Sequence, residues 1–192
     1  DASRPLDYTT LYQAFAQLAE IDLHDAATGA PASHALLAER ARARGIAIAE
    51  ADTWGDMFRR ILTEKREPYL GLYRPEILCE YPVQESALAR PHPDDPNVAE
   101  RFELYCCGVE LANGFGELTD PAEQRTRFEA WMAEKQRIYG ERYPIDEDFL
   151  AALAHMPPAS GCALGFDRLV MLATGAERLD QVIWTPMAET QR

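Results

Sequence analysis

Hydrophobic residues recur at helical spacing in several parts of the chain. Steps of three and four residues between apolar side chains are typical of a helix with one face toward a core. Helices are therefore predicted over residues 7–18, 32–44, 54–64, 121–139 and 146–155. In the longest of these, the side chains expected toward the core are Phe128, Trp131, Met132 and Ile138. The first three helices all precede the first predicted strand.

Other segments carry the β-branched and aromatic residues that favour strands. Strands are predicted over residues 77–81, 102–106 and 109–113, with residues 163–165 in a central strand. A two-residue turn, Cys107-Gly108, joins the second strand to the third. The proline-rich segment 91–96 is expected to form no regular structure. These patterns predict an α+β fold with a mixed, mostly antiparallel sheet flanked by helices.

The predicted hairpin places two carboxylates on one face of the sheet. With the turn at residues 107–108, Tyr105 pairs with Glu110, and Glu103 pairs with Ala112. Because cross-strand partners share a face and faces alternate along a strand, Glu103 and Glu110 lie close enough to share a cation. Magnesium suits such a pair, since it takes oxygen ligands and bridges carboxylates to substrate phosphates. The alternative is a solvated hairpin face with two ordinary glutamates.

A glycine-rich segment, NGFGE at residues 113–117, follows this hairpin. Phe115 and Glu117 could form a pocket with an aromatic wall and an anionic end, which suits an ammonium group. The alternative is a turn that leads into the next helix, with Thr119 or Asp120 as its N-cap. Both interpretations can hold together.

Residues 160–172, SGCALGFDRLVML, pass from small side chains into a predicted helix. Gly161 and Gly165 would let a buried strand approach a flat ligand closely. Arg168 is predicted in the first turn of a helix that Gly175 ends, where its guanidinium matches the geometry of phosphate. The alternative is that this arginine and the aspartate before it only anchor the start of the helix.

Three motifs in a fixed order are more specific than any one of them. They are YPVQESALA from Tyr81, ERFELY through GVELANGFGELTDPAEQ from Glu100, and SGCALGFDRLVML from Ser160. Together they resemble the C-terminal half of a class II aminoacyl-tRNA synthetase catalytic domain, in its lysine branch. The resemblance covers residues 81–187 well and 1–80 loosely, and the last motif is similar to class II motif 3. Two details look more like the paralogous elongation factor P lysyltransferase family: ELANG from Glu110, and Ala163 where the lysine synthetases usually have glycine.

The resemblance implies a role for each matching position. Glu103 and Glu110 would ligate Mg²⁺, and Glu110 and Leu111 would contact ATP. Gly165 would lie under the nucleotide, and Arg168 would act in catalysis by contacting its terminal phosphates. The implied substrate-binding residues are Asn113 for the carboxylate, Glu117 for an amino group, Phe115 for the pocket wall and Ala163 for its shape.

The implied activity is that of a ligase that uses ATP and magnesium. It would activate lysine or β-lysine as an adenylate and join it to a lysine of elongation factor P. A lysyl-tRNA synthetase fragment is the second interpretation, with tRNA as the less favoured acceptor. A non-catalytic, synthetase-like binding module is the third.

Motifs 1 and 2 of the synthetase family have no match in this sequence. Residues 1–192 are therefore expected to be the C-terminal part of the catalytic domain, incomplete at the N-terminus. Within it, a helical insertion is expected at 1–66 and the sheet with its site at 67–192. In the family, motif 2 supplies an arginine for the reacting phosphate, so this chain alone is expected to be inactive. Because motif 1 forms the family's dimer, a homodimer is expected for the complete protein.

Composition narrows the range of partners. The 192 residues carry a formal net charge of −13, and 47% of them are apolar, which is ordinary for a globular chain. A broad nucleic-acid surface needs clustered lysine and arginine, and the excess of acid argues against one. The sequence shows no signal peptide and no apolar run of membrane length. A cytoplasmic location and no membrane partner are therefore expected.

Overall fold

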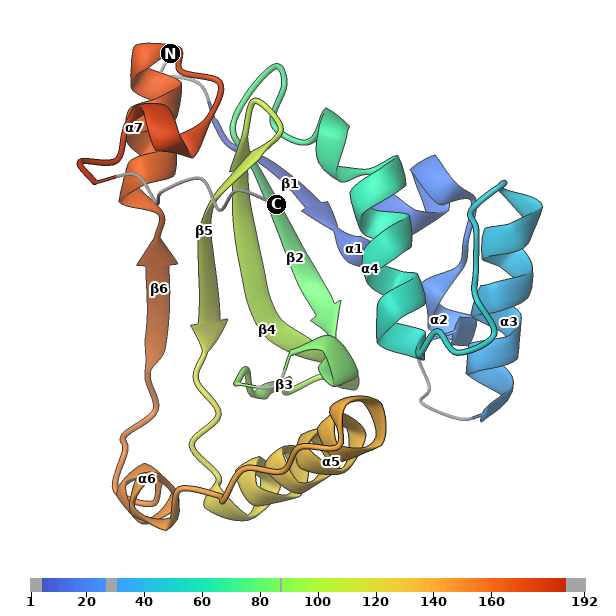
Figure 1. Cartoon of the computed structure of the whole chain (residues 1–192), viewed down its shortest axis with the longest axis vertical. Helices are drawn as coiled ribbons and strands as arrows, with labels where there is room; N and C mark the ends of the chain where they lie inside the picture. Colours follow the sequence, from blue (N-terminus) through green and yellow to red (C-terminus); the bar gives the residue numbers. More distant parts are fainter. Residues whose placement is uncertain (1–4, 27–30, 87, 186–192) are drawn as a thin grey trace.

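A six-stranded sheet forms the centre of the molecule (Figure 1). The computed structural model describes residues 5–26, 31–86 and 88–185. The strands are β1 (Asp7–Thr10), β2 (Glu76–Pro82), β3 (Pro91–His92), β4 (Asp95–Cys106), β5 (Val109–Gly116) and β6 (Ser160–Leu164). They follow the order β1-β2-β4-β5-β6, with β3 paired to β4. Since β1 runs parallel to β2 and the other pairs are antiparallel, the predicted α+β fold with a mostly antiparallel sheet is confirmed.

Helices lie beside the sheet and at both of its ends (Figure 1). They are α1 (Leu11–Ala14), its π-helical continuation η1 (Phe15–Ala19), α2 (Leu23–Ala26), α3 (Pro31–Ala43), α4 (Trp54–Lys65), α5 (Pro121–Tyr139), α6 (Glu147–Leu153) and α7 (Phe166–Thr174). Short 3₁₀ turns are η2 (Glu67–Tyr69), η3 (Val83–Glu85) and η4 (Leu179–Gln181). The helices α3 to α6 match predicted helices, and α5 begins after Asp120, one of the two predicted caps. Among the described residues, no helix combines the length and the hydrophobicity that a membrane span requires.

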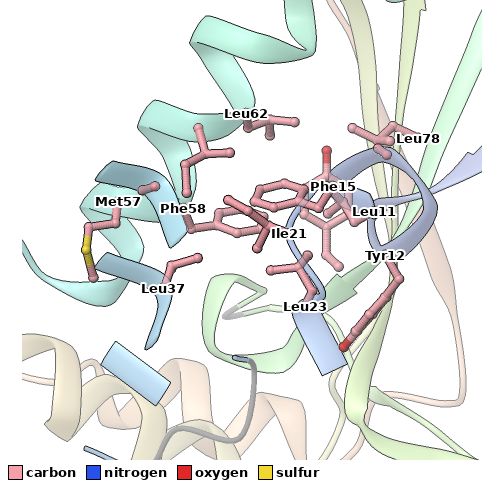
Figure 2. Close-up of a cluster of buried hydrophobic side chains, with 14 of the residues drawn as sticks. Leu11, Tyr12, Phe15, Ile21, Leu23, Leu37, Met57, Phe58, Leu62 and Leu78 are labelled. Atoms are coloured by element: carbon pink, nitrogen blue, oxygen red, sulfur yellow. The ribbon is translucent and has the colours of Figure 1, made fainter. Parts of the chain in front are cut away.

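A cluster of buried hydrophobic side chains lies between the first helices and β2 (Figure 2). Phe15 stacks on Phe58 of α4 with ring centroids 5.1 Å apart, and Leu78 of β2 closes the cluster. Its other members include Leu11, Ile21, Leu23, Leu37 and Met57. A capping box between Thr53 and Asp56 fixes the start of α4, a pattern that contributes about 1 kcal/mol. The cluster and the cap together hold α4 in place beside the sheet.

The strand β1 occupies the first part of the predicted helix 7–18. It pairs in parallel with β2, and the Thr9 hydroxyl donates a hydrogen bond of 2.6 Å to the carboxylate of Glu76. The helix begins only at Leu11. The prediction was wrong at this point because β2 offers an edge whose hydrogen bonds outweigh a weak local preference for helix.

Two further expectations about strands were wrong. The proline-rich segment 91–96 forms β3 and the start of β4, in a tight hairpin where His92 pairs with Asp95. A two-residue strand at the margin of a sheet tolerates proline, because its outer side needs no hydrogen-bond donor. β6 is not central, since β5 is its only strand partner in the part of the chain that the structure describes. Its Leu164 is 53% exposed, as a strand with one described partner allows.

The helix α5 buries less than its sequence predicted. Trp131 and Ile138 are each 48% exposed, and Phe128 and Met132 are only partly buried. Phe128 meets Phe149 of α6, with ring centroids 5.9 Å apart. The expected core-facing stripe was wrong because α5 lies along one end of the sheet, next to α6, and does not cross a sheet face (Figure 1).

Candidate active site

The β4–β5 hairpin has the predicted turn. Cys107 and Gly108 have φ angles of 55° and 74°, the left-handed values that a two-residue type I′ turn requires. Tyr105 pairs with Glu110, as the sequence predicted. Since Glu103 lies two residues before Tyr105, both glutamates project from the same face of the sheet.

Farther along β5, the structure departs from the predicted register. Glu103 pairs with Asn113 instead of Ala112. The strand carries one extra residue at this point, Leu111, which makes a β-bulge. Because side chains alternate along a strand, the extra residue brings Asn113, and the residue two positions after it, to the face of Glu110. Without the bulge they would point to the opposite side.

A cavity of about 490 Å³ lies over this face. Three of the predicted site residues line it, namely Glu103, Glu110 and Phe115. Another wall comes from α4 and η2, through Phe58, Arg59, Leu62 and Glu67. The shared face predicted for the two glutamates is therefore confirmed, and the helical segment before the sheet contributes to the same cavity.

Each of the two glutamates has a guanidinium partner. Glu103 is 7% exposed, and its oxygens accept hydrogen bonds from Arg101 at 2.5 Å and from the Tyr105 hydroxyl at 2.7 Å. Arg168 donates to the backbone oxygen of Glu110 at 2.8 Å and to its carboxylate at 3.0 Å. These cations offset part of the cost of desolvating two carboxylates side by side.

The segment from β6 into α7 places Arg168 as predicted. The helix starts after the N-cap Gly165 and ends at Gly175, so the arginine lies in its first turn. The Gly165 N–H donates to the Leu111 carbonyl at 2.8 Å, which ties the start of the helix to the bulge in β5. A Cβ at Gly165 would lie 3.4 Å from Cδ of Arg168, so the arginine side chain runs close to this part of the backbone.

The remaining predicted substrate residues lie at the β5–β6 edge. Ala163 pairs with Asn113 across the two strands. The side-chain oxygen of Asn113 is buried and has no hydrogen-bond partner among the described residues. Glu117 packs against Gly161, where a Cβ would lie 2.4 Å from its Oε1. The structure thus brings these residues together beside the cavity and not on its wall.

Sequence reasoning missed the groups that surround Glu103. Arg101 and Tyr105 flank it at two-residue spacing on β4, and Tyr81 lines the same cavity from β2. The guanidinium carbon of Arg101 lies 4.2 Å from the ring centroid of Tyr81 and 5.8 Å from that of Phe115. Strand alternation could have identified the first two, because residues two positions away share the face of Glu103. Tyr81 has no such signal, since an irregularity in β2 just before it sets the direction of its side chain.

The described lining of the cavity has an excess of acid. It holds four carboxylates and two guanidinium groups: Glu67, Glu85, Glu103, Glu110, Arg59 and Arg101. Burial raises the pKa of Glu85, although the two arginines act in the opposite direction, and burial also raises the pKa of Glu67. Buried carboxylates gain from a nearby positive charge. The arrangement therefore favours a cationic ligand.

The two glutamates predicted to bind magnesium fit that ion chemically. Mg²⁺ usually takes one or two protein carboxylates and completes its shell with water and substrate phosphates. A carboxylate oxygen has two lone pairs, so each oxygen of Glu103 keeps one beyond its hydrogen bond. At Glu110, the side chain of Arg168 donates to Oε2 and not to Oε1, so Oε1 keeps both of its lone pairs. Among the described residues, no group of three or more His, Cys, Asp or Glu side chains could hold a metal ion. The donor set suits an ion shared with a bound phosphate.

Known proteins share much of this sequence. The family model for class II tRNA synthetases (D, K and N) matches residues 60–189. A lysine–tRNA ligase of Dehalococcoides mccartyi (strain CBDB1) is 40% identical over 188 residues, which is 97% of this chain and 36% of that protein. An elongation factor P–(R)-β-lysine ligase of Edwardsiella ictaluri is 53% identical over 118 residues, or 61% of this chain and 36% of that protein. The chain therefore spans about a third of the length of these relatives.

Proposed function

The chain belongs to the class II tRNA synthetases of the D, K and N group, and from this premise we propose that it carries part of the active site of an ATP-dependent ligase. The ligase would activate lysine or β-lysine as an adenylate and transfer it to a lysine of elongation factor P. The observation that carries the proposal is that Glu103 and Glu110 line the same cavity. Arg168, in the first turn of α7, donates a hydrogen bond to the carboxylate of Glu110.

In this proposal the nucleotide binds over the bulge of β5. Glu103 and Glu110 would ligate magnesium, which when bound neutralises charge on the phosphates. The side chain of Arg168 is 42% exposed, and its planar fork is suited to the terminal phosphates of ATP. Leu111 and Gly165 already meet through a backbone hydrogen bond and would contact the nucleotide from below.

The amino acid is proposed to bind at the β5–β6 edge. Asn113 would hold the carboxylate through its amide, and Glu117 would pair with an amino group. Phe115 would form an aromatic wall between this edge and the cavity. Ala163, which faces Asn113 in the sheet, adds a methyl group at the edge and would favour β-lysine over α-lysine. The excess of carboxylates in the neighbouring cavity supports a substrate with two amino groups.

Elongation factor P is the proposed acceptor, and tRNA is the second candidate. The first is supported by the ELANG sequence from Glu110 and by the 53% identity to an elongation factor P–(R)-β-lysine ligase. The net charge of −13 also disfavours a broad nucleic-acid surface. The second candidate is supported by the lysine–tRNA ligase whose similarity extends over 97% of the chain.

The proposal extends to the organisation of the protein. Residues 1–66 would act as an insertion that contributes β1 to the sheet and α4 to the wall of the cavity, and residues 67–192 would carry the site. A homodimer and a cytoplasmic location are proposed for a longer form that includes motifs 1 and 2. Sedimentation of such a form tests the dimer, because a monomer at micromolar concentration would contradict it.

Calorimetry of this chain with ATP and magnesium tests the proposed function. ATP binding should require magnesium and should weaken in Glu103→Gln and Glu110→Gln. A matched control is Glu129→Gln, an exposed glutamate of α5 that should leave binding unchanged. No ATP binding by a longer form that carries motif 2, at any magnesium concentration, would favour the non-catalytic module. With a longer form that carries motif 2, transfer of labelled lysine to elongation factor P or to tRNA separates the two acceptors.

A further inference from the structure

Glu103 is held at both oxygens by neighbours on its own strand. Arg101 donates to one oxygen at 2.5 Å, and the hydroxyl of Tyr105 donates to the other at 2.7 Å. The three side chains project from one face of β4 because they are spaced by two residues. A carboxylate with a partner at each oxygen has one orientation, whereas a free carboxylate rotates among several. We refer to these two partners as the Arg101–Tyr105 clamp.

The arginine of the clamp is itself fixed on several sides. Its guanidinium carbon lies 4.2 Å from the ring centroid of Tyr81 and 5.8 Å from that of Phe115, distances at which a cation is attracted to an aromatic face. One of its terminal nitrogens also donates to the backbone oxygen of Glu85. Arg101 cannot leave Glu103 without losing these contacts. The neighbouring strands β2 and β5 therefore help to orient the glutamate.

The surroundings of the clamp differ from those of a structural ion pair in a closed core. Nε of Arg101 and the hydroxyl of Tyr81 are buried, and neither has a hydrogen-bond partner among the described residues. Buried polar groups are nearly always paired, so two orphans in one place require an explanation. Arg101, Glu103 and Tyr105 also line the cavity of about 490 Å³. The clamp therefore stands at a ligand site.

We propose that Arg101 and Tyr105 are positioning residues that hold Glu103 in the orientation needed to ligate a divalent cation. The inference rests on the proposed function of the cavity. Carboxylates that ligate metals are themselves hydrogen-bonded, and loss of such a partner lowers metal affinity by about 10- to 100-fold. Each donor of the clamp leaves one lone pair on its oxygen, so the clamp and the ion do not compete for the same electrons.

The test is the affinity of the chain for Mn²⁺ in the presence of ATP, measured by titration with electron paramagnetic resonance. Tyr105→Phe keeps the buried ring and removes only the hydroxyl. Its matched control is Tyr73→Phe, at a tyrosine that is 95% exposed. Tyr105→Phe should lower the Mn²⁺ affinity about 10-fold or more. Arg101→Lys should act in the same direction, because an ammonium cannot reproduce the planar fork. The control should match the wild type.

The outcomes separate this proposal from the proposed function. If Glu103→Gln loses Mn²⁺ while Tyr105→Phe and Arg101→Lys keep wild-type affinity, the positioning proposal is overturned and the function stands. If Glu103→Gln binds as well as the wild type, or if the wild type binds no Mn²⁺, both are overturned. A lower urea midpoint in the two clamp variants with unchanged Mn²⁺ affinity would show a structural role alone and would also overturn the proposal.

Discussion

A methyl group added at Gly161 should displace the carboxylate that is proposed to hold the substrate amino group. The Cβ of Gly161→Ala would lie 2.4 Å from Oε1 of Glu117 and 3.6 Å from its Cδ. Ordinary contact of a Cβ begins at 3.4 Å, so the oxygen must move by about 1.0 Å. Glu117 is only partly buried, and its end can move without disturbing the sheet. The alanine should therefore change binding more than folding.

The size of the effect follows from the bond that would be lost. A hydrogen bond to a charged group contributes about 1.5–3 kcal/mol, and a displacement of 1 Å can forfeit most of it. At 1.4 kcal/mol per factor of ten, the affinity for lysine should fall by roughly 10- to 100-fold. The free energy of unfolding should change by less than about 1 kcal/mol, as is usual for a substitution near the surface.

Calorimetry with α-lysine and β-lysine in the presence of ATP and magnesium measures this effect. Cys162→Ala is the matched control, because it alters the next residue of β6, which is exposed and belongs to the other face. A double-mutant cycle with Glu117→Gln tests whether the methyl group acts through the Glu117 carboxylate. Once that carboxylate is gone, Gly161→Ala should cause little further loss of lysine affinity. Full lysine affinity in Gly161→Ala would refute the argument. So would additive losses in the double variant, because the methyl group would then act without Glu117.

Three other substitutions test the remaining roles. Arg168→Ala should weaken ATP binding about 10-fold or more by removing a charge-assisted contact, with little change in the urea midpoint since the side chain is 42% exposed; unchanged ATP affinity contradicts it. Ala163→Gly should shift the ratio of β-lysine to α-lysine affinities toward α-lysine, by no more than about 1–3 kcal/mol for one methyl group; an equal ratio contradicts it. Burial raises the pKa of Glu85 above its ordinary 4.5, so the folded chain binds this proton more tightly than the unfolded chain. The stability of the wild type should therefore fall, relative to Glu85→Gln, as pH rises through the interval between these two pKa values. Urea unfolding at pH 4 and pH 7 checks this, and an equal difference between the two proteins at both values contradicts it.

The parts of the fold that could be predicted have a strong local signal. The turn at Cys107-Gly108 was predictable because few residue pairs accept two positive φ angles, and glycine at the second place is among the best. The start of α7 was predictable because glycine residues mark both of its ends. Since both features depend on neighbours in sequence, the same local rules also placed Glu103 and Glu110 on one face.

The parts that could not be predicted depend on residues far apart in the chain. β1 is a strand because it meets β2, nearly seventy positions later, and nothing within the segment itself indicates this partner. The pattern of α5 predicts a buried face, but its place at the end of the sheet leaves Trp131 and Ile138 half exposed. The contacts of the Arg101 guanidinium with the rings of Tyr81 and Phe115 could not be predicted for a similar reason, since these two residues come from other strands.

The bulge at Leu111 brings Glu110 and Asn113 to the same face of the sheet. In a regular strand, Glu110 and Asn113 would point to opposite faces, because they are three positions apart. A pocket that uses both therefore requires one extra residue between them, and the structure has it. The Leu111 carbonyl accepts the N–H of Gly165, and this bond brings the start of α7 to Glu110. One irregularity thus places the glutamate proposed to bind metal on the same face as the residues proposed to bind the amino acid, and a change that restores a regular β5 should separate them.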